Sequence, residues 1–367
     1  MALHRDLFPV TQQFAFLNNA AESPLNTATH ARLAEYLACT LTAPHTKPAT
    51  VRQQVREHLA ALLGGLPEDF ALMSGTSQGL NTVAAGVAWE AGDNVVLPEG
   101  EHWNNAFPWF ALRERGVEVR VAPLAADGAV LPESIEALVD HRTRLVTTAH
   151  VQFATGHRCD IPRLAAIAHR KGALLVVDGI QGAGCCPLNL AADGVDVYAA
   201  GGFKWLLGAP GTGFLYINKA ARARVRPTLP GMFAGGPALT ELVLHGDARQ
   251  YEGGSIAYAL FHGWTAGLAL LREVGVGTIF ERNQRLTGLL LRGLEGKPHL
   301  RLLSPVADPA ARSQIVVVTA GSPERNRELC DKLLAQGVVV ANRTDSVRIS
   351  PNFYNTEEEI ARLLELL

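Results

Sequence analysis

The sequence predicts an α/β protein in which a large domain, built on a mostly parallel sheet, is followed by a smaller α+β domain. Between about residues 70 and 218, short β-rich runs alternate with amphipathic stretches, which is the pattern of βαβ units. After Tyr251 this pattern gives way to a long helical stretch and then to short strands and helices. A chain of 367 residues that is 48% hydrophobic can bury two cores of this kind.

Seven strands are predicted for the large domain, each a short run rich in β-branched or apolar residues. They cover residues 71–73, 95–97, 117–122, 144–149, 174–177, 197–199 and 213–217. Helices are expected between them, for example over residues 78–89 and 162–171. The second of these helices follows Asp160 as a cap and has proline at its first position.

The C-terminal part is predicted to form a second unit. A long apolar stretch, residues 256–274, is expected to continue as a helix toward Leu291. Strands over 313–319, 337–341 and 347–350 then alternate with helices over 324–336 and 356–367. The Gly- and Pro-rich segment 227–254 is expected to be a long functional or interface loop. The predicted organisation is an arm (1–25) that packs with the small domain, a large domain (26–255) and a small domain (256–367).

Composition and charge exclude several classes of partner. With 33 Lys+Arg against 35 Asp+Glu and no long basic run, the chain lacks the charge pattern of a nucleic-acid or anionic-membrane binder. Residues 1–10 lack a signal pattern, and no apolar run approaches the roughly 20 residues that span a bilayer. The 5 cysteines have no C-x-x-C spacing, which argues against a disulfide framework and a zinc site. We therefore expect a cytoplasmic protein that acts on a small molecule.

A lysine and an acid follow predicted strands. Lys204 lies in Gly-Gly-Phe-Lys-Trp-Leu-Leu-Gly, residues 201–208, where apolar neighbours would desolvate its amine and make it nucleophilic. A lysine that snorkels to the surface would explain the same flanks. Asp178 ends the apolar run 173–177, and ligands of open α/β sheets bind at the carboxyl ends of the strands. A helix cap or a turn would also place an acid there.

Two further motifs follow strand ends. Residues 74–78, Ser-Gly-Thr-Ser-Gln, come between a strand and a helix, where backbone N–H groups and the helix dipole attract an anion. Plain helix capping would also favour hydroxyl side chains at this position. His102, or Trp103 beside it, follows another strand and can stack on a ring.

Together these motifs supply the four parts that pyridoxal 5′-phosphate (PLP) needs. The cofactor requires a lysine for its aldehyde, an acid for its pyridine nitrogen, a cradle for its phosphate and a wall for its ring. Asp178 precedes Lys204 by 26 residues, with one predicted strand between them. We therefore expect a PLP-dependent enzyme.

The ordered motifs resemble the class V aminotransferase family of fold-type I PLP enzymes, which includes cysteine desulfurases, selenocysteine lyases and isopenicillin-N-epimerase-like proteins. The resemblance runs from Leu-Asn-Asn-Ala-Ala at residues 17–21 to Arg-Ile-Ser-Pro-Asn-Phe-Tyr-Asn at residues 348–355, nearly the whole chain. It implies the fold-type I architecture, a small amino-acid substrate and a homodimer with a shared active site.

The resemblance also implies a role for each matching residue near the cofactor ring. Lys204 corresponds to the lysine that holds PLP as a Schiff base, and Asp178 to the partner of the pyridine nitrogen. Gln181 corresponds to the glutamine that binds the phenolic oxygen. His102 falls at the position that stacks on the ring, and with Lys204 and Asp178 it forms the predicted catalytic set.

Other matching residues are expected to bind phosphate and substrate. Ser255, in the Tyr-Glu-Gly-Gly-Ser segment, resembles a residue that contacts phosphate across the dimer interface. Arg348 matches the arginine that pairs with the substrate carboxylate, where a planar fork fits the geometry, and Asn19 is also assigned to the substrate. The phosphate cradle itself is assigned to Gly75, Thr76 and Ser77.

Three departures from the cysteine desulfurases bear on the reaction. Segment 338–346 is short and lacks the nucleophilic cysteine that desulfurases carry before the arginine motif. Phe153 stands where desulfurases have an asparagine, and the residues before Lys204 are Gly-Gly-Phe where they have serine and histidine. Packing of Cys185 and Cys186 as small apolar side chains is preferred to a role at the site.

The expected reaction takes place at the α-carbon of a small amino acid, by transamination or lyase chemistry. The alternatives are an epimerase of the isopenicillin-N-epimerase-like type and a cysteine desulfurase or C–S lyase without the usual loop cysteine. All begin when Lys204 removes the α-proton while Arg348 holds the carboxylate. A dinucleotide oxidoreductase is disfavoured because the glycine-rich segment 208–213 precedes a strand instead of following one. A non-catalytic binding protein of the same fold is the remaining class.

Overall fold

The structure is a computed structural model that describes residues 4–42, 50–236 and 240–367. Its centre is a seven-stranded sheet in the order β2-β8-β7-β6-β5-β3-β4. The strands are β2 (Phe70–Met73), β3 (Asn94–Pro98), β4 (Glu118–Ala122), β5 (Thr143–Ala149), β6 (Leu174–Asp178), β7 (Val197–Gly201) and β8 (Gly213–Ile217). Of these seven, β8 alone runs antiparallel to its neighbours, β2 and β7. The predicted mostly parallel, seven-stranded sheet is therefore confirmed.

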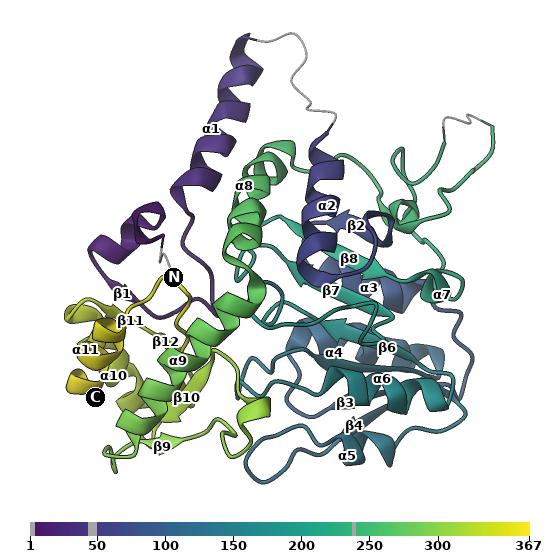
Figure 1. The fold of residues 1–367 in the computed structure, drawn as a ribbon. Helices are drawn as coiled ribbons and strands as arrows, with labels where there is room; N and C mark the ends of the chain where they lie inside the picture. The colour runs from purple at the N-terminus through teal and green to yellow at the C-terminus, as the bar shows by residue number, and fades with distance from the viewer. Residues whose placement is uncertain (1–3, 43–49, 237–239) are drawn as a thin grey trace.

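Helices cover both faces of this sheet, which explains why its central strands are continuous apolar runs. The helices on one face are α3 (Thr76–Gly86) and α4 (Trp103–Phe110); those on the other are α2 (Val51–Leu63), α6 (Ile161–Arg170) and α8 (Tyr258–Val274) (Figure 1). Along β6, Val176 packs into the core under α3 and α4, and Val177 into the core under α2, α6 and α8. Both side chains are fully buried. The strand ends that carry the predicted site residues are thus fixed from two sides.

The small domain is an antiparallel sheet covered by helices. Its sheet has the order β12-β13-β10-β9, formed by β9 (Arg301–Leu302), β10 (Val316–Thr319), β12 (Ala341–Arg343) and β13 (Ser346–Ile349). The helices are α9 (Val276–Leu294), α10 (Pro323–Ala335) and α11 (Glu357–Leu366). Leu290, Val318 and Ile360 meet in a separate apolar core.

The N-terminal arm lies against the small domain, although the two are far apart in the sequence. β1 (Ala15–Phe16) pairs in parallel with β11 (Val338–Val339), and Asn18 forms a bridge to Ser350. The division into arm, large domain and small domain stays a prediction. Residues 1–3 of the predicted arm and 237–239 of the predicted 227–254 loop lie outside the described residues.

Two predictions for the C-terminal part were wrong in detail. The expected continuous helix ends at Val274, because Gly275 adopts φ 85° and a new helix, α9, begins after it. The expected strand over 337–341 is two short strands, β11 and β12, which belong to different sheets.

Three further helices are α1 (Thr27–Thr42), α5 (Pro132–Glu136) and α7 (Lys219–Arg222), and of these α5 packs against α6 and β3. Figure 1 shows α1 projecting from the body of the molecule, and Thr29 is its one buried residue. Among the described residues, no helix combines the length and the apolar character that a bilayer crossing requires.

Candidate active site

Lys204 lies in a tight turn directly after β7. The turn is closed by hydrogen bonds from Gly208 N to Gly202 O at 2.8 Å and from Leu207 N to Lys204 O at 3.2 Å. A Cβ at Gly202 would come within 2.8 Å of the Trp264 ring, so the glycine is required for this close approach. Leu207, buried and with φ 58°, is in the left-handed region, which costs roughly 1 kcal/mol for a residue with a side chain. The surrounding packing thus holds the lysine in a defined place.

The Lys204 amine is desolvated and lies among charged groups. Burial and the neighbouring Arg348 lower its pKa to about 8, against the opposing effect of the Asp178 carboxylate. Arg343 also lowers the pKa of this amine. A lysine with such a pKa has a substantial neutral, nucleophilic fraction near pH 8.

Asp178 ends β6 in the middle of the sheet and is 2% exposed. Its Oδ1 accepts the Ile180 N–H at 3.0 Å, and its carboxylate forms no ion pair with any lysine or arginine in the described chain. Burial, with a contribution from the Glu101 carboxylate, raises the pKa of Asp178 to about 7, and Lys204 opposes this shift. A buried carboxyl group of this kind is well suited to a protonated ring nitrogen.

The start of α3 meets the end of β7, directly before the Lys204 turn. Thr76 Oγ1 accepts the Gly201 N–H at 3.0 Å. A Cβ on Gly213 would lie 2.6 Å from Gly75 Cα, so the two glycines permit a close backbone approach. Ser77 is exposed on the first turn of α3. Because the first N–H groups of a helix lack acceptors within the helix, this end can bind a phosphate.

His102 caps α4 and faces the same group of charges. Its Nδ1 accepts an N–H of the first turn of α4 at 3.2 Å, and its ring lies 4.9 Å from the Phe153 ring. Burial, followed by the positive charges of Lys204, Arg343 and Arg348, lowers the pKa of His102 to about 4. The imidazole is therefore neutral near pH 7, with its proton on Nε2, and can stack on an aromatic ring.

Gln181 and Asn19 join the N-terminal arm to the site. Gln181 Oε1 accepts the Trp205 indole N–H at 2.9 Å, and Gln181 Nε2 donates to Ala20 O at 3.0 Å. Asn19 Nδ2 donates to Ser350 O at 2.9 Å, and its Oδ1 accepts the Tyr354 hydroxyl. One N–H on each amide is left for a ligand, so their contacts with cofactor and substrate stay predictions.

Arg348, on β13, is a buried cation without a carboxylate partner. Its side chain is 2% exposed; Nη1 donates to Phe153 O at 3.2 Å, and Nε is buried without a hydrogen-bond partner. Burial and the neighbouring Arg343 lower the pKa of Arg348 to about 10. Within the described chain no Asp or Glu pairs with it, and a buried unpaired charge is costly. The site therefore fits an incoming carboxylate.

Ser255 follows a segment that is anchored by Glu252. The buried Glu252 pairs with Arg52 and Arg56 and accepts the Leu72 N–H at 2.8 Å, which fixes this segment against β2. Ser255 itself is exposed. No hydrogen bond joins it to another candidate among the described residues, and its phosphate contact across a dimer interface stays a prediction.

Sequence reasoning missed Glu101 as a site residue. Glu101 is 9% exposed and accepts hydrogen bonds from Ala149 N at 2.7 Å, Asn105 Nδ2 at 2.8 Å and Gln152 Nε2 at 2.6 Å. These contacts tie the His102 loop to the end of β5, which lies next to Asp178. An acid directly before a candidate ring-stacking histidine was the available signal.

Arg343 was also missed, because the sequence suggested a short loop at this position. It lies at the end of β12 and affects the pKa values of His102, Lys204 and Arg348. The sequence carries no direct signal for it, because the approach of Arg343 to Arg348 is set by the pairing of β12 with β13.

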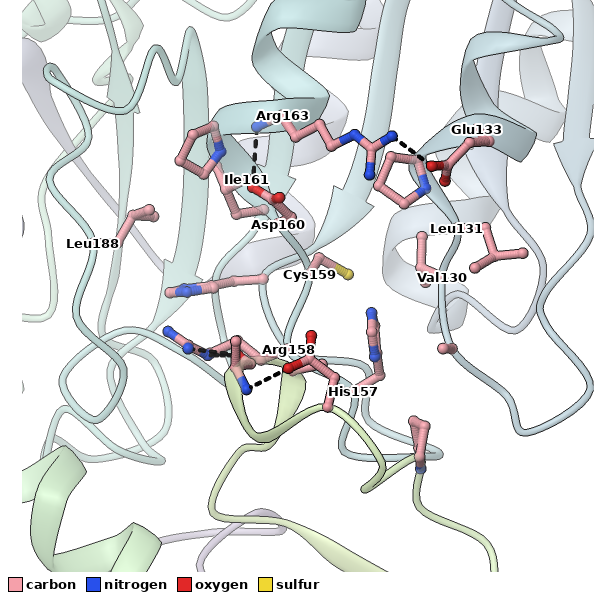
Figure 2. A pocket seen from close by; sticks show the side chains of 18 of the residues that line it. Val130, Leu131, Glu133, His157, Arg158, Cys159, Asp160, Ile161, Arg163 and Leu188 are labelled. Atoms are coloured by element: carbon pink, nitrogen blue, oxygen red, sulfur yellow. Dashed lines mark hydrogen bonds and ion pairs between the residues drawn. The ribbon is translucent and has the colours of Figure 1, made fainter.

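A cavity of about 680 Å³ lies elsewhere, between the large domain and the loop before β10, and none of the candidate site residues lines it (Figure 2). Two arginine side chains that line it interact with other groups of the protein. Arg163 pairs with Glu133, and Arg158 donates to Ala310 O and lies 4.8 Å from the Phe280 ring. The cavity is therefore separate from the candidate site around Lys204.

Comparisons with known proteins agree with the geometry. The model of the class-V aminotransferase family matches residues 15–363. The chain is 33% identical to a probable cysteine desulfurase of Methanothermobacter thermautotrophicus over 86% of this chain and 82% of that protein. It is 28% identical to the uncharacterized aminotransferase YcbU of Bacillus subtilis over 99% and 96% of the two chains.

A solved structure gives the same result. The cystine C–S lyase C-DES, in complex with its reaction product cysteine persulfide, superposes with a TM-score of 0.90 at 26% identity over 98% of both chains. The buried acid, the lysine turn, the α3 cradle and the unpaired Arg348 all fit PLP and an amino acid. The chain belongs to the class-V aminotransferase family and is a fold-type I, PLP-dependent enzyme of amino-acid chemistry.

Proposed function

We propose that this enzyme cleaves the C–S bond of a small sulfur-containing amino acid by β-elimination. The observation that carries the proposal is the buried Arg348 guanidinium, without a carboxylate partner, near the Lys204 amine. Lys204, Asp178, Gln181, His102 and the α3 cradle would hold the cofactor. Bound there, PLP supplies an electron sink for the α-carbon of the substrate.

The side chains have complementary tasks in this reaction. Arg348 binds the α-carboxylate and orients the substrate. Asp178 holds the proton on the ring nitrogen, which keeps the ring electron-poor. The Lys204 amine takes the α-proton and delivers it to the departing sulfur, whose bond to Cβ breaks with both electrons leaving on sulfur. With one water consumed, the products are a thiol or persulfide, pyruvate and ammonium.

The surroundings of the cysteines support elimination over desulfuration. Desulfuration needs an accessible thiolate near the substrate sulfur. Cys185 and Cys186 are fully buried, and burial raises the pKa of Cys185. Burial also raises the pKa of Cys159 to about 12, and the segment before Arg348 contains no cysteine. Cys39 and Cys330 lie on the helices α1 and α10, apart from these groups.

We further propose that two copies assemble into a homodimer and that Ser255 then reaches the partner's phosphate cradle. Large apolar side chains are exposed on α1 and on the loop after α7, at levels of 85% for Leu41, 80% for Leu229 and 76% for Met232. Burial of such side chains against a second copy would remove them from water. Sedimentation at micromolar concentration tests this assembly. A cytoplasmic location stays a prediction.

The reaction is tested by product analysis on the PLP-loaded enzyme with cystine, cysteine and alanine as substrates. We expect pyruvate, ammonium and a persulfide from cystine. Alanine from cysteine, with sulfide released when a thiol reductant is added, would instead identify a desulfurase. A keto acid with a pyridoxamine spectrum would identify an aminotransferase, and loss of stereochemistry at the α-carbon would identify an epimerase. Each of these three results contradicts the proposed elimination.

A cysteine variant provides the matched control. The double substitution Cys39→Ala with Cys330→Ala removes the exposed thiol and the half-buried one. We expect the double variant to keep its rate of pyruvate formation within about twofold, because elimination uses no protein thiol. Loss of most activity would show that a thiol takes part.

A further inference from the structure

Arg343 and Arg348 extend from the same face of the β12–β13 hairpin. Arg343 pairs with Ser346 and Ala341 pairs with Arg348 in this antiparallel ladder. Since paired residues share a face and side chains alternate along each strand, the two arginines are diagonal neighbours. Such neighbours lie roughly 7–8 Å apart at their backbones. One small substrate can therefore contact both guanidinium groups.

The protein leaves the charge of Arg343 unpaired. The described chain forms no ion pair with this side chain, which is half-buried and lies with its guanidinium carbon 5.6 Å from the Phe153 ring centroid. The backbone of Phe153 also accepts the hydrogen bond from Arg348. One phenylalanine thus supports both cations, through its ring and through its carbonyl.

The two arginines also repel each other. The positive charge of Arg343 is, after burial, the cause that lowers the pKa of Arg348. An anion bound by both groups relieves this repulsion. If Arg348 takes the α-carboxylate, a second anionic group is needed to neutralise Arg343.

We propose that Arg343 is a specificity-determining residue that binds a second carboxylate, carried on the side chain of the substrate. The inference rests on the proposed function, which assigns the α-carboxylate to Arg348. The substrate class is then an amino acid whose sulfur carries a fragment with its own carboxylate. In the elimination this fragment leaves on sulfur, so Arg343 also holds the leaving group.

The second anion site is tested by binding, without any reaction. Adipate, a six-carbon dicarboxylate, and hexanoate, its monocarboxylate counterpart, have no amine to react with PLP. Calorimetric titration of the PLP-loaded enzyme should show adipate binding at least about tenfold more tightly than hexanoate, the gain expected for hydrogen bonds to a charged group. Equal affinity for the two ligands would overturn the proposal.

Variants assign that preference to one side chain. Arg343→Gln should reduce the preference for adipate to within about twofold, and Arg343→Lys should restore part of it. Arg325→Gln, which removes an exposed arginine from α10, is the charge-matched control and should retain the full preference. A preference for adipate that survives Arg343→Gln would reject the assignment.

A pair of mixed disulfides tests the same residue in catalysis. Cysteine joined to 3-mercaptopropionate carries the second carboxylate, whereas cysteine joined to 2-mercaptoethanol does not. Arg343→Gln should raise KM about tenfold more for the first substrate than for the second, with little difference between the two in the change of kcat. Equal losses on both substrates would contradict the proposal. If neither substrate reacts while the adipate preference persists, the proposed reaction fails and the second anion site stands.

Discussion

The Lys204 site and the cavity in Figure 2 differ in how their charges are satisfied. In the cavity, Arg163 pairs with Glu133, and Arg158 donates to a backbone carbonyl. At the Lys204 site, Arg348 also donates to a backbone carbonyl, that of Phe153, but it is more deeply buried and its Nε has no hydrogen-bond partner. A hollow space whose cations are satisfied needs no ligand, whereas a buried unpaired cation indicates one. Unsatisfied charge, and not empty volume, therefore indicates the candidate active site.

The largest expected effect comes from removing the Lys204 amine. Lys204→Ala should lose the visible absorbance band of the lysine-bound cofactor and reduce kcat by about a thousandfold or more, since both cofactor attachment and proton transfer use this group. Lys171→Ala, at the exposed C-terminal end of α6, is the matched control and should retain both properties. An unchanged band in Lys204→Ala, measured by absorbance before and after borohydride, would refute the assignment.

The second prediction contrasts one arginine from each region. Arg348→Met should lower kcat/KM by roughly 100-fold or more, because it leaves the substrate carboxylate without its partner. Arg158→Met, in the cavity wall, should change kcat/KM by less than about twofold.

The order of the two arginine variants should reverse for stability: Arg158→Met should be the less stable protein, although Arg348→Met is the less active one. Arg348→Met loses a hydrogen bond to Phe153 O but also removes a buried charge without a carboxylate partner, so its free energy of unfolding should be equal to or above that of the wild type. Arg158→Met loses a charged hydrogen bond to Ala310 O and should be destabilised by about 1 kcal/mol. Urea unfolding of the apo-proteins measures the free energy of unfolding of both variants. A large loss of stability in Arg348→Met would mean that this charge has a structural partner.

The sequence predicted the parts of the fold that depend on local patterns. Six of the seven central strands, all except the edge strand β4, are buried on both faces and therefore read as apolar runs of the right length. Features set by tertiary contacts were missed. The residues on either side of Val340 follow one another in an apolar run, yet they pair with different partners, β1 and β13, and so form two strands.

The same distinction applies to the site. Lys204, Asp178 and His102 follow strands or precede a helix, where motifs are visible in the sequence. Arg343 could not be found in this way, because its approach to Arg348 depends on the register of the β12–β13 hairpin. The left-handed conformation of Leu207 has no sequence signal either, since leucine rarely adopts it.

The smallest predicted effect concerns the pH dependence of cofactor attachment. PLP reacts with the neutral form of the Lys204 amine, so the attachment rate of the apo-enzyme should rise with pH and level off above about pH 8, in line with a pKa of about 8. Arg348 and Arg343 both lower this pKa by repelling the protonated amine. Removing either positive charge should therefore raise the pKa of Lys204 and move the rate profile to higher pH.

At pH 7 the expected consequence is an attachment rate that falls by about twofold to fivefold in Arg348→Met and by less in Arg343→Gln, because Arg348 is the stronger of the two causes. Stopped-flow absorbance of apo-enzyme mixed with PLP, from pH 6 to 9, measures the profile. Arg158→Met should coincide with the wild type. If all three variants followed one curve, burial alone would set the reactivity of the lysine, and the unpaired arginines would act only on the substrate.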